Sequence, residues 1–308
     1  MIPDINFHLT SRCNMSCRFC FARFKNVKPL GKGDSLSIVN KIADYGFKKI
    51  NFVGGEPTLV PWLSDLLAKA KKCGLITSVV TNGWNINDDW LGKHAECLDW
   101  LGFSVDSLDP EINNRLGRTV KGFKLPDLSF YLEALKAVRE YEINIKINTV
   151  VTQLNKNERF HKLIQEIKPE KWKIFQVLII ENENPDARSL IVSREEFDEF
   201  LYAHANLEPV INIYPEYCED MIGSYLMIDP AGRFVDNSSR VYRMSESILR
   251  IGVVQALKQV NVSYEKFLTR QDNNRMKRIV TQVKKSPTPS ASAASSQARC
   301  AQLSASKS

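Results

Sequence analysis

The sequence has no continuous run of about 18 uncharged apolar residues, so it predicts no membrane-spanning helix. We expect neither a signal peptide nor an amphipathic leader, because the pattern of a first strand begins at Asp4. It also has no repeat of basic and aromatic residues, and its net charge of +7 is too diffuse to indicate nucleic-acid binding. We therefore expect a cytoplasmic protein that binds neither membrane nor nucleic acid, and whose charge suits an anionic partner.

Cysteine is sparse outside one short segment. Three of the seven cysteines fall between residues 13 and 20, and this bunching favours reduced thiols over a disulfide framework. We interpret the other four, which are isolated along the chain, as buried or bystander thiols: Cys73, Cys97, Cys218 and Cys300.

The three clustered cysteines, Cys13, Cys17 and Cys20, have the spacing C-x3-C-x2-C directly after the apolar run of residues 5–9. Thiolates are the usual ligands of iron–sulfur clusters, and a four-iron cluster needs four ligands. The segment supplies three of them, so one iron would be open to a ligand that is not protein. A zinc site is one alternative, although zinc usually takes four ligands in paired spacing and no second pair is present. Three core cysteines are the other alternative.

Strand and helix patterns alternate about six times between residues 4 and 180, with short connections. This alternation predicts parallel strands with helical crossovers, whose ligand-binding loops lie at the carboxyl ends of the strands. The cysteine segment and the run Gly54-Gly55-Glu56-Pro57 both follow such strands. We therefore expect an α/β fold, a partial (β/α)6 barrel of the TIM type over residues 1–205.

The individual elements are predicted as follows. Strands are expected at 4–10, 48–53, 76–81, 100–105, 144–151 and 172–180. Helices are expected at 35–45, with Ser35 as N-cap, and at 59–73, 90–97, 127–141, 158–167 and 195–204. Residues 206–274 are expected to close the barrel mouth as an extension, with a hairpin from segments 210–214, 225–228 and 233–235 and helices across 253–260 and 264–268. Residues 275–308 are expected to be a disordered Ser/Ala-rich tail.

Several lysines fall within or at the edge of apolar strands, where an unpaired charge is costly. Lys146 alternates with Ile145 and Ile147, which predicts isoleucines on the outside and the lysine inside the barrel. Fixed cations in a dry site suit a polyanion such as a triphosphate. The alternative is a lysine that reaches solvent from a strand end. His8 should also face inward, either as a ligand or as a satisfied core histidine.

The cysteine segment and the Gly-Gly-Glu-Pro run together resemble the signature of the radical S-adenosylmethionine enzymes. In that superfamily a 4Fe–4S cluster leaves one iron to the amino and carboxylate groups of S-adenosylmethionine. The resemblance implies that the cysteines bind the cluster, and it leaves open whether Asp106 only caps a loop. The residues implied to contact S-adenosylmethionine are Phe21, Gly54, Gly55, Glu56, Asn82, Ser104, Asp106 and Arg118.

Longer stretches are similar to the viperin family, in order and spacing, from Asp4 to Leu268. They include residues 6–10, 49–52, 116–118, 146–148, 172–176, 224–226 and 247–249. The resemblance implies a lyase-type dehydration of a ribonucleoside triphosphate to its 3′-deoxy-3′,4′-didehydro form. The 5′-deoxyadenosyl radical takes the C4′ hydrogen, and the 3′-hydroxyl leaves as water. Such products terminate RNA chains and act against viruses. CTP is the expected substrate, with UTP next.

The viperin resemblance also implies roles for particular residues. Tyr225 joins the three cysteines as a catalytic residue. The triphosphate contacts are implied to be Asn6, Lys49, Asn51, Arg118, Lys146, Lys173 and Tyr225. An external one-electron reductant and the iron–sulfur assembly machinery are the implied partners. The membrane-binding N-terminal helix and the aromatic C-terminal end of vertebrate viperin are not matched here, so their associations are not carried over.

Two other functions remain open. The chain could be a radical enzyme that acts on a peptide or another metabolite, although no second set of cysteines is present. It could also be a non-catalytic antiviral module that binds a nucleotide. Cleavage of S-adenosylmethionine that depends on a nucleotide would separate these possibilities.

Overall fold

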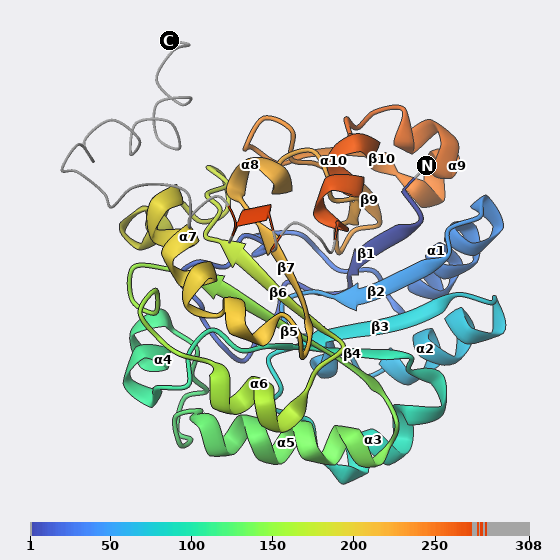
Figure 1. The fold of residues 1–308 in the computed structure, drawn as a ribbon. Helices are drawn as coiled ribbons and strands as arrows, with labels where there is room; N and C mark the ends of the chain where they lie inside the picture. The colour runs from blue at the N-terminus through green and yellow to red at the C-terminus, as the bar shows by residue number, and fades with distance from the viewer. Residues whose placement is uncertain (1, 273–275, 277, 280, 282–308) are drawn as a thin grey trace.

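A computed structural model describes residues 2–272, 276, 278, 279 and 281. In the described part of the chain one sheet has the strand order β10-β9-β8-β1-β2-β3-β4-β5-β6-β7. Each strand from β1 to β7 pairs in parallel with the next (Figure 1). These strands are β1 (Asp4–His8), β2 (Lys49–Val53), β3 (Ile76–Thr81), β4 (Trp100–Ser104), β5 (Asn144–Val151), β6 (Lys171–Gln176) and β7 (Asn212–Glu216).

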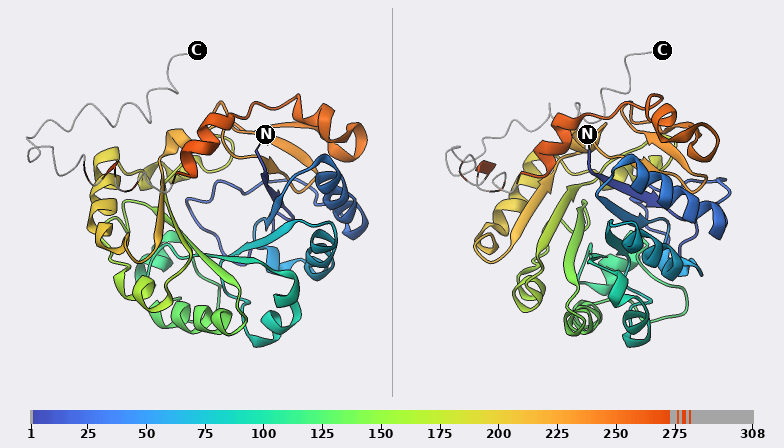
Figure 2. Two further views of the ribbon diagram at one scale, coloured as in Figure 1. Left: turned by 45° about the vertical axis from the view of Figure 1, so that its right-hand side comes forward. Right: turned by 90° about the vertical axis from the view of Figure 1, so that its right-hand side faces the viewer.

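Helices cover the outer, convex face of this curved sheet (Figure 2). They are α1 (Lys32–Tyr45), α2 (Leu63–Lys72), α3 (Asp88–His94), α4 (Pro110–Leu116), α5 (Leu128–Glu140), α6 (His161–Ile167) and α7 (Arg194–Ala203). Short 3-10 turns lie at Pro57–Leu59, Ala95–Cys97, Pro185–Leu190 and Ala205–Leu207. The expected barrel-type α/β fold is therefore confirmed.

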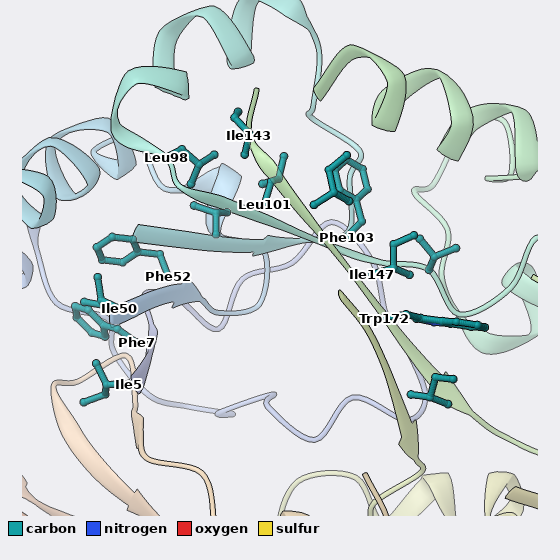
Figure 3. Packing of buried hydrophobic residues seen from close by; sticks show 14 of the residues in the cluster. Ile5, Phe7, Ile50, Phe52, Leu98, Leu101, Phe103, Ile143, Ile147 and Trp172 are labelled. Carbon is teal, nitrogen blue, oxygen red and sulfur yellow. The ribbon is translucent and has the colours of Figure 1, made fainter. Parts of the chain in front are cut away.

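The alternation of side chains along each strand separates the hydrophobic core from the interior of the barrel. Phe7 and Phe52 are buried in the layer between strands and helices, whereas Asn6 and Asn51 beside them line the interior. Figure 3 shows this core, in which side chains from neighbouring strands pack together. The packing of the core therefore determines which face of each strand is available for binding and catalytic side chains. The residues labelled there are Ile5, Phe7, Ile50, Phe52, Leu98, Leu101, Phe103, Ile143, Ile147 and Trp172.

Helix boundaries differ from the sequence prediction where turn residues intervene. The prediction of Ser35 as N-cap is wrong, because α1 begins at Lys32 after Gly31 and Ser35 is buried within the helix. The helix expected over 59–73 is divided, since Val60 takes an extended conformation before Pro61. The sequence prediction also missed α4, although Asp109 caps its start.

The C-terminal extension adds more to the sheet than expected. The first segment of the predicted hairpin is β7, which pairs in parallel with β6 as a seventh strand of the barrel. The hairpin consists of β8 (Met227–Ile228) and β9 (Arg233–Asp236), and β8 also pairs with β1. The remaining elements are α8 (Cys218–Met221), β10 (Arg243–Ser247), α9 (Ile248–Leu257) and α10 (Tyr264–Arg270). The extension therefore adds strands at both edges of the curved sheet, next to β6 and next to β1.

Two further features bear on the predicted organisation. Met276 and Ile279 are helical and buried, while the Ser/Ala-rich segment lies outside the described residues. The domain boundaries at 205 and 274 stay predictions. Within residues 2–272 and the four described positions beyond, no helix is long and apolar enough to span a membrane.

Candidate functional site

A cavity of about 300 Å³ lies inside the curved sheet and is lined from β1 through β6, from the cysteine loop and from the C-terminal extension. Every site residue predicted from the sequence lines it. These residues are Asn6, Cys13, Cys17, Cys20, Phe21, Lys49, Asn51, Gly54, Gly55, Glu56, Asn82, Ser104, Asp106, Arg118, Lys146, Lys173 and Tyr225. We call the part around Cys13, Cys17 and Cys20 the cysteine end, and the part around Lys49, Lys146, Lys171 and Lys173 the lysine end.

Main-chain hydrogen bonds hold the cysteine loop on two sides. On one side the Gly55 and Glu56 amides donate to the carbonyls of Thr10 and Arg12, at 2.6 and 2.8 Å. On the other side, the Ser16 amide donates to the Gly117 carbonyl at 3.1 Å, and a further amide bond joins residues 18 and 116. The turn after β2 and the end of α4 therefore clamp the loop between them.

Two glycines make this clamp possible. A Cβ atom on Gly55 would lie 2.2 Å from the Arg12 carbonyl oxygen, and one on Gly117 would lie 2.3 Å from that of Ser16. Gly117 also has φ +76°, a conformation that favours glycine. The glycines are needed for the close approach of the cysteine loop, a role that the sequence analysis did not assign to them.

Glu56 is buried and ties the turn after β2 to the end of β3. One carboxylate oxygen accepts hydrogen bonds from Thr58 and from the Thr81 hydroxyl, and the other accepts from the Asn82 amide at 2.8 Å. Burial raises the pKa of the Glu56 carboxyl, against these hydrogen bonds, which favour its ionised form. The Asn82 side chain in turn reaches Asn14 of the cysteine loop at 2.7 Å.

The three thiols occupy an environment that disfavours free thiolates. Burial raises the pKa of Cys17 to about 12, partly opposed by Arg118, and burial also raises the pKa of Cys13 and Cys20. Thiolates at Cys13 and Cys17 are disfavoured further by the neighbouring sulfurs, which shows that the three sulfurs share one electrostatic environment. Bound iron would remove this penalty, because its positive charge stabilises thiolates.

The thiols therefore fit an iron–sulfur cluster. Among the described residues, no three His, Cys, Asp or Glu side chains are placed to hold a single metal ion. A cluster makes no such demand, because each thiolate binds a different iron. The open side of the loop faces the cavity, where a small molecule could complete the coordination.

Arg118 and Asp106 form a buried ion pair beside Cys17. Their Nη1 and Oδ2 atoms are 2.8 Å apart, and the guanidinium also donates to the Ser104 carbonyl oxygen at 2.5 Å. Burial raises the pKa of Asp106, while Arg118 and the Val150 amide oppose this. Burial lowers the pKa of Arg118, but Asp106, Tyr131 and Cys17 together outweigh this effect and the pKa is raised. The carboxylate thus fixes the Arg118 guanidinium next to the cluster loop, 3.9 Å from Cys17 Sγ.

At the lysine end, four ammonium groups approach one another inside the barrel. Burial lowers the pKa of Lys146 well below its usual value, and Lys49, Lys173 and Lys171 lower it further. Burial likewise lowers the pKa of Lys49 to about 8, although Asp4 opposes this. The Nζ atoms of Lys49 and Lys171 lie 4.9 and 5.1 Å from the centre of the Trp100 ring. The lysine end has more positive charge than the nearby carboxylates neutralise.

Polar atoms without a protein partner also face this cavity. His8 Nδ1, Asn51 Oδ1 and Asn148 Oδ1 are buried and accept or donate no hydrogen bond within the described residues. Burial lowers the pKa of His8 to about 4, so the imidazole is neutral near pH 7. Unsatisfied buried polar groups are costly, so these atoms suit a ligand with hydroxyl or amide groups.

The structure adds residues that the sequence analysis missed. Asn148 and Lys171 had a detectable signal, because each shares the strand parity of a predicted site residue, Lys146 and Lys173. Trp100 and Asp4 begin strands and share the parity of the predicted residues Ser104 and Asn6, so the same signal would have found them. Arg270 lies in α10. The periodicity of this segment predicts a helix, but it does not predict that the helix brings Arg270 to the cavity. These residues show how far the cavity extends beyond the recognisable segments.

Comparison with known proteins agrees with this site. The sequence matches the family described as the Radical SAM superfamily over residues 7–167. A protein of Flammeovirga pacifica, named S-adenosylmethionine-dependent nucleotide dehydratase, is 42% identical over 279 residues, covering 88% of this chain and 95% of that protein. A protein of Danio rerio, named S-adenosylmethionine-dependent nucleotide dehydratase RSAD2, is 34% identical over 282 residues, covering 87% and 76%.

A solved structure supports the fold independently. Native anSMEcpe with bound AdoMet is similar with a TM-score of 0.59 and 18% identity, over 75% of this chain and 73% of that one. Fold, cysteine loop and family match together define a radical S-adenosylmethionine protein, whose cofactors are a 4Fe–4S cluster and S-adenosylmethionine. Within that superfamily, the chain belongs to the family of the S-adenosylmethionine-dependent nucleotide dehydratases, as its resemblance to viperin predicted.

Proposed function

We propose that this protein is a radical S-adenosylmethionine enzyme that dehydrates a ribonucleoside triphosphate to its 3′-deoxy-3′,4′-didehydro analogue. Its relatives are named nucleotide dehydratases, and its cavity has two chemically different ends. The cysteine end suits the cluster and S-adenosylmethionine. The lysine end suits the triphosphate of the substrate.

The observation that carries the proposal is the crowding of cations at the lysine end. Lys146 is surrounded by Lys49, Lys171 and Lys173, and all four line the same cavity. Without an anion, these charges repel one another in a site of restricted solvation. A triphosphate carries about four negative charges and would relieve that repulsion, which makes it a better fit than an uncharged peptide.

The residues of the cysteine end would hold the cofactors. Cys13, Cys17 and Cys20 would hold three irons of the cluster, and the Gly54-Gly55 turn and Arg118 line the cavity beside these cysteines. The carboxylate of Asp106 fixes the Arg118 guanidinium, which keeps it in place before any ligand arrives. When bound, the cluster and S-adenosylmethionine supply the one-electron chemistry that removes the C4′ hydrogen of the substrate.

The rest of the reaction depends on the placement of the substrate between the two ends. Triphosphate bound at Lys49, Lys146 and Lys173 would place the ribose between the lysine end and the cysteine loop. Asn6 and Asn51 would offer amide groups to that ribose, and Tyr225 lies close enough to Lys173 to meet the phosphates. The 3′-hydroxyl leaves as water, so the product would be lighter by one water molecule.

An anaerobic assay tests the proposal. The cluster is reconstituted, dithionite and S-adenosylmethionine are added, and 5′-deoxyadenosine is quantified with CTP, UTP, GTP and ATP in turn. We expect a large rise with one triphosphate, CTP first and UTP second, together with a product lighter by one water. Slow cleavage that no nucleotide stimulates would contradict the proposed substrate and favour a radical enzyme of another specificity.

We further propose that the enzyme works in the cytoplasm and supplies an antiviral terminator of RNA synthesis. It would draw its electrons from an external one-electron reductant, which the assay replaces by dithionite. It would receive its cluster from the iron–sulfur assembly machinery.

A further inference from the structure

Glu216, at the end of β7, is a fully buried carboxylate that does not itself line the cavity. Three side chains that contact it do line the cavity. They come from three separate places: Lys173 from β6, Tyr225 from the segment before β8, and Arg270 from the end of α10. A single buried carboxylate therefore contacts three side chains that form one wall of the cavity.

The contacts divide the two oxygens of Glu216 among these partners. Lys173 Nζ lies 2.5 Å from Oε1, and the Tyr225 hydroxyl donates to Oε2 at 2.5 Å. Arg270 Nη1 lies 3.3 Å from Oε2, while its guanidinium stacks 3.6 Å above the centre of the Tyr225 ring. Arg270 also donates to the Ser224 carbonyl oxygen at 2.7 Å. The orientation of each partner thus depends on the same carboxylate.

The charges of this network are fixed by its burial and by the pairing. Burial disfavours the Glu216 anion, but Lys173 and Arg270 outweigh this effect and its pKa is lowered. Burial raises the pKa of Tyr225 well above its usual value, against the effect of Arg270, and Glu216 raises it further. The phenol therefore stays protonated with its hydrogen directed to Glu216.

We propose that Glu216 is the positioning residue of the substrate-binding wall, because its one carboxylate holds Lys173, Tyr225 and Arg270 in the arrangement that receives the triphosphate. The inference rests on the proposed function and adds a residue that touches no substrate. It also assigns a structural role to the C-terminal extension, because Arg270 on α10 contacts the barrel through its ion pair with Glu216.

The opposite expectation follows if Glu216 only neutralises excess positive charge. Removing a carboxylate from the neighbourhood of a polyanion site should then tighten nucleotide binding, by simple electrostatics. If Glu216 positions its partners, its removal leaves buried cations without a counter-charge, and they reorient or lose a proton. Binding then weakens. The sign of the change separates the two roles.

The experiment compares Glu216→Gln with Glu170→Gln. Glu170 also accepts from an arginine and from a main-chain amide, but it lies outside the cavity. Binding of the preferred triphosphate is measured by calorimetry on protein without cluster, and turnover on the reconstituted enzyme. We expect Glu216→Gln to raise Kd at least about tenfold and Glu170→Gln to leave it unchanged. Equal or tighter binding by Glu216→Gln would overturn the proposal.

The pH dependence of the triphosphate Kd tests the positioning role separately, because a general loss of stability would not shift this pH dependence. Burial lowers the pKa of Lys173, and Glu216 is the group that raises it again; Arg270 and Lys171 lower it. Lys146, Lys49 and Tyr225 also face this network. Without the carboxylate, Lys173 should lose its proton at lower pH, so Kd should begin to rise at lower pH than in wild type. Glu216→Asp, which keeps the charge, should restore part of the profile.

Hydrogen exchange in the ligand-free protein keeps the two proposals distinguishable. Release of Arg270 should speed amide exchange across α10 in Glu216→Gln but not in Glu170→Gln. If wild type binds no triphosphate, the proposed function fails while this readout still tests the link between α10 and the barrel. Unchanged exchange and an unchanged pH profile would show that Glu216 positions nothing.

Discussion

The cysteine end and the lysine end of the cavity are built in different ways. Main-chain hydrogen bonds hold the cysteine loop from both sides, through the turn at Gly55 and through Gly117. At the lysine end the parallel strand ladder holds the backbone, but it does not fix the ends of the long side chains. Its ammonium groups extend from three strands, β2, β5 and β6, and their positions depend on side-chain contacts such as that of Lys173 with Glu216.

This difference bears on what each end can tolerate. A loop held by its backbone accepts changes of neighbouring side chains but no added atom at the points of contact. A wall of side chains accepts small steric changes but responds to any change of charge, because each cation affects the pKa of the next. Substitutions at the cysteine end should therefore act on the cluster, and those at the lysine end on the substrate.

The largest effect is expected at a cluster ligand. Cys17→Ala removes the thiolate of one iron, so we expect loss of the visible absorption of the cluster and of all 5′-deoxyadenosine formation. Absorption spectra and iron content measure this. Cys97→Ala, which removes a cysteine outside the cavity, is the control. Activity that survived Cys17→Ala would contradict the cluster assignment.

Gly55→Ala should damage the same end through the backbone alone. Its added Cβ would lie 2.2 Å from the Arg12 carbonyl oxygen, so the cysteine loop must move. Such overpacking costs about 1–3 kcal/mol, and we expect most of the cluster to be lost while triphosphate binding to the apo protein persists. Gly33→Ala, with no atom within 4 Å of its Cβ, should behave as wild type. Full cluster occupancy in Gly55→Ala would argue against the clamp.

The success of the sequence predictions also differs between the cysteine end and the lysine end. The cysteine end is marked by contiguous runs, so residues 13–20 and Gly54-Gly55-Glu56 could be assigned from the order of amino acids alone. Strand parity also placed Asn6 and Lys146 in the interior, where the structure has them. Alternation of strands and helices was enough for the fold class.

The remainder depended on contacts between distant segments. Glu216 precedes a tyrosine at the end of an ordinary apolar strand, and only the parallel pairing of β7 with β6 brings it to Lys173. The same pairing is why the assignment of 210–214 to the hairpin was wrong, whereas the hairpin of the other two predicted segments is confirmed. Arg270 reaches the cavity from α10 because of the packing of the whole extension, which no local pattern encodes.

At the lysine end, Lys146→Ala should raise the KM for the triphosphate about tenfold and leave cluster absorption intact. A charge-assisted contact is lost, and the repulsion among the remaining lysines is reduced, which limits the effect. Steady-state kinetics measure it, with the exposed Lys136→Ala as control. An unchanged KM would remove Lys146 from the binding site.

The smallest effect concerns the proton of Lys49. Its pKa is about 8 in the free protein because of burial, so part of the population is neutral at pH 8. A bound triphosphate favours the charged form, and binding at that pH should therefore take up protons. Calorimetry in buffers of different ionisation enthalpy measures the uptake. Lys49→Arg stays charged at any pH used and should take up fewer protons, whereas equal uptake would mean that Lys49 does not meet the phosphates.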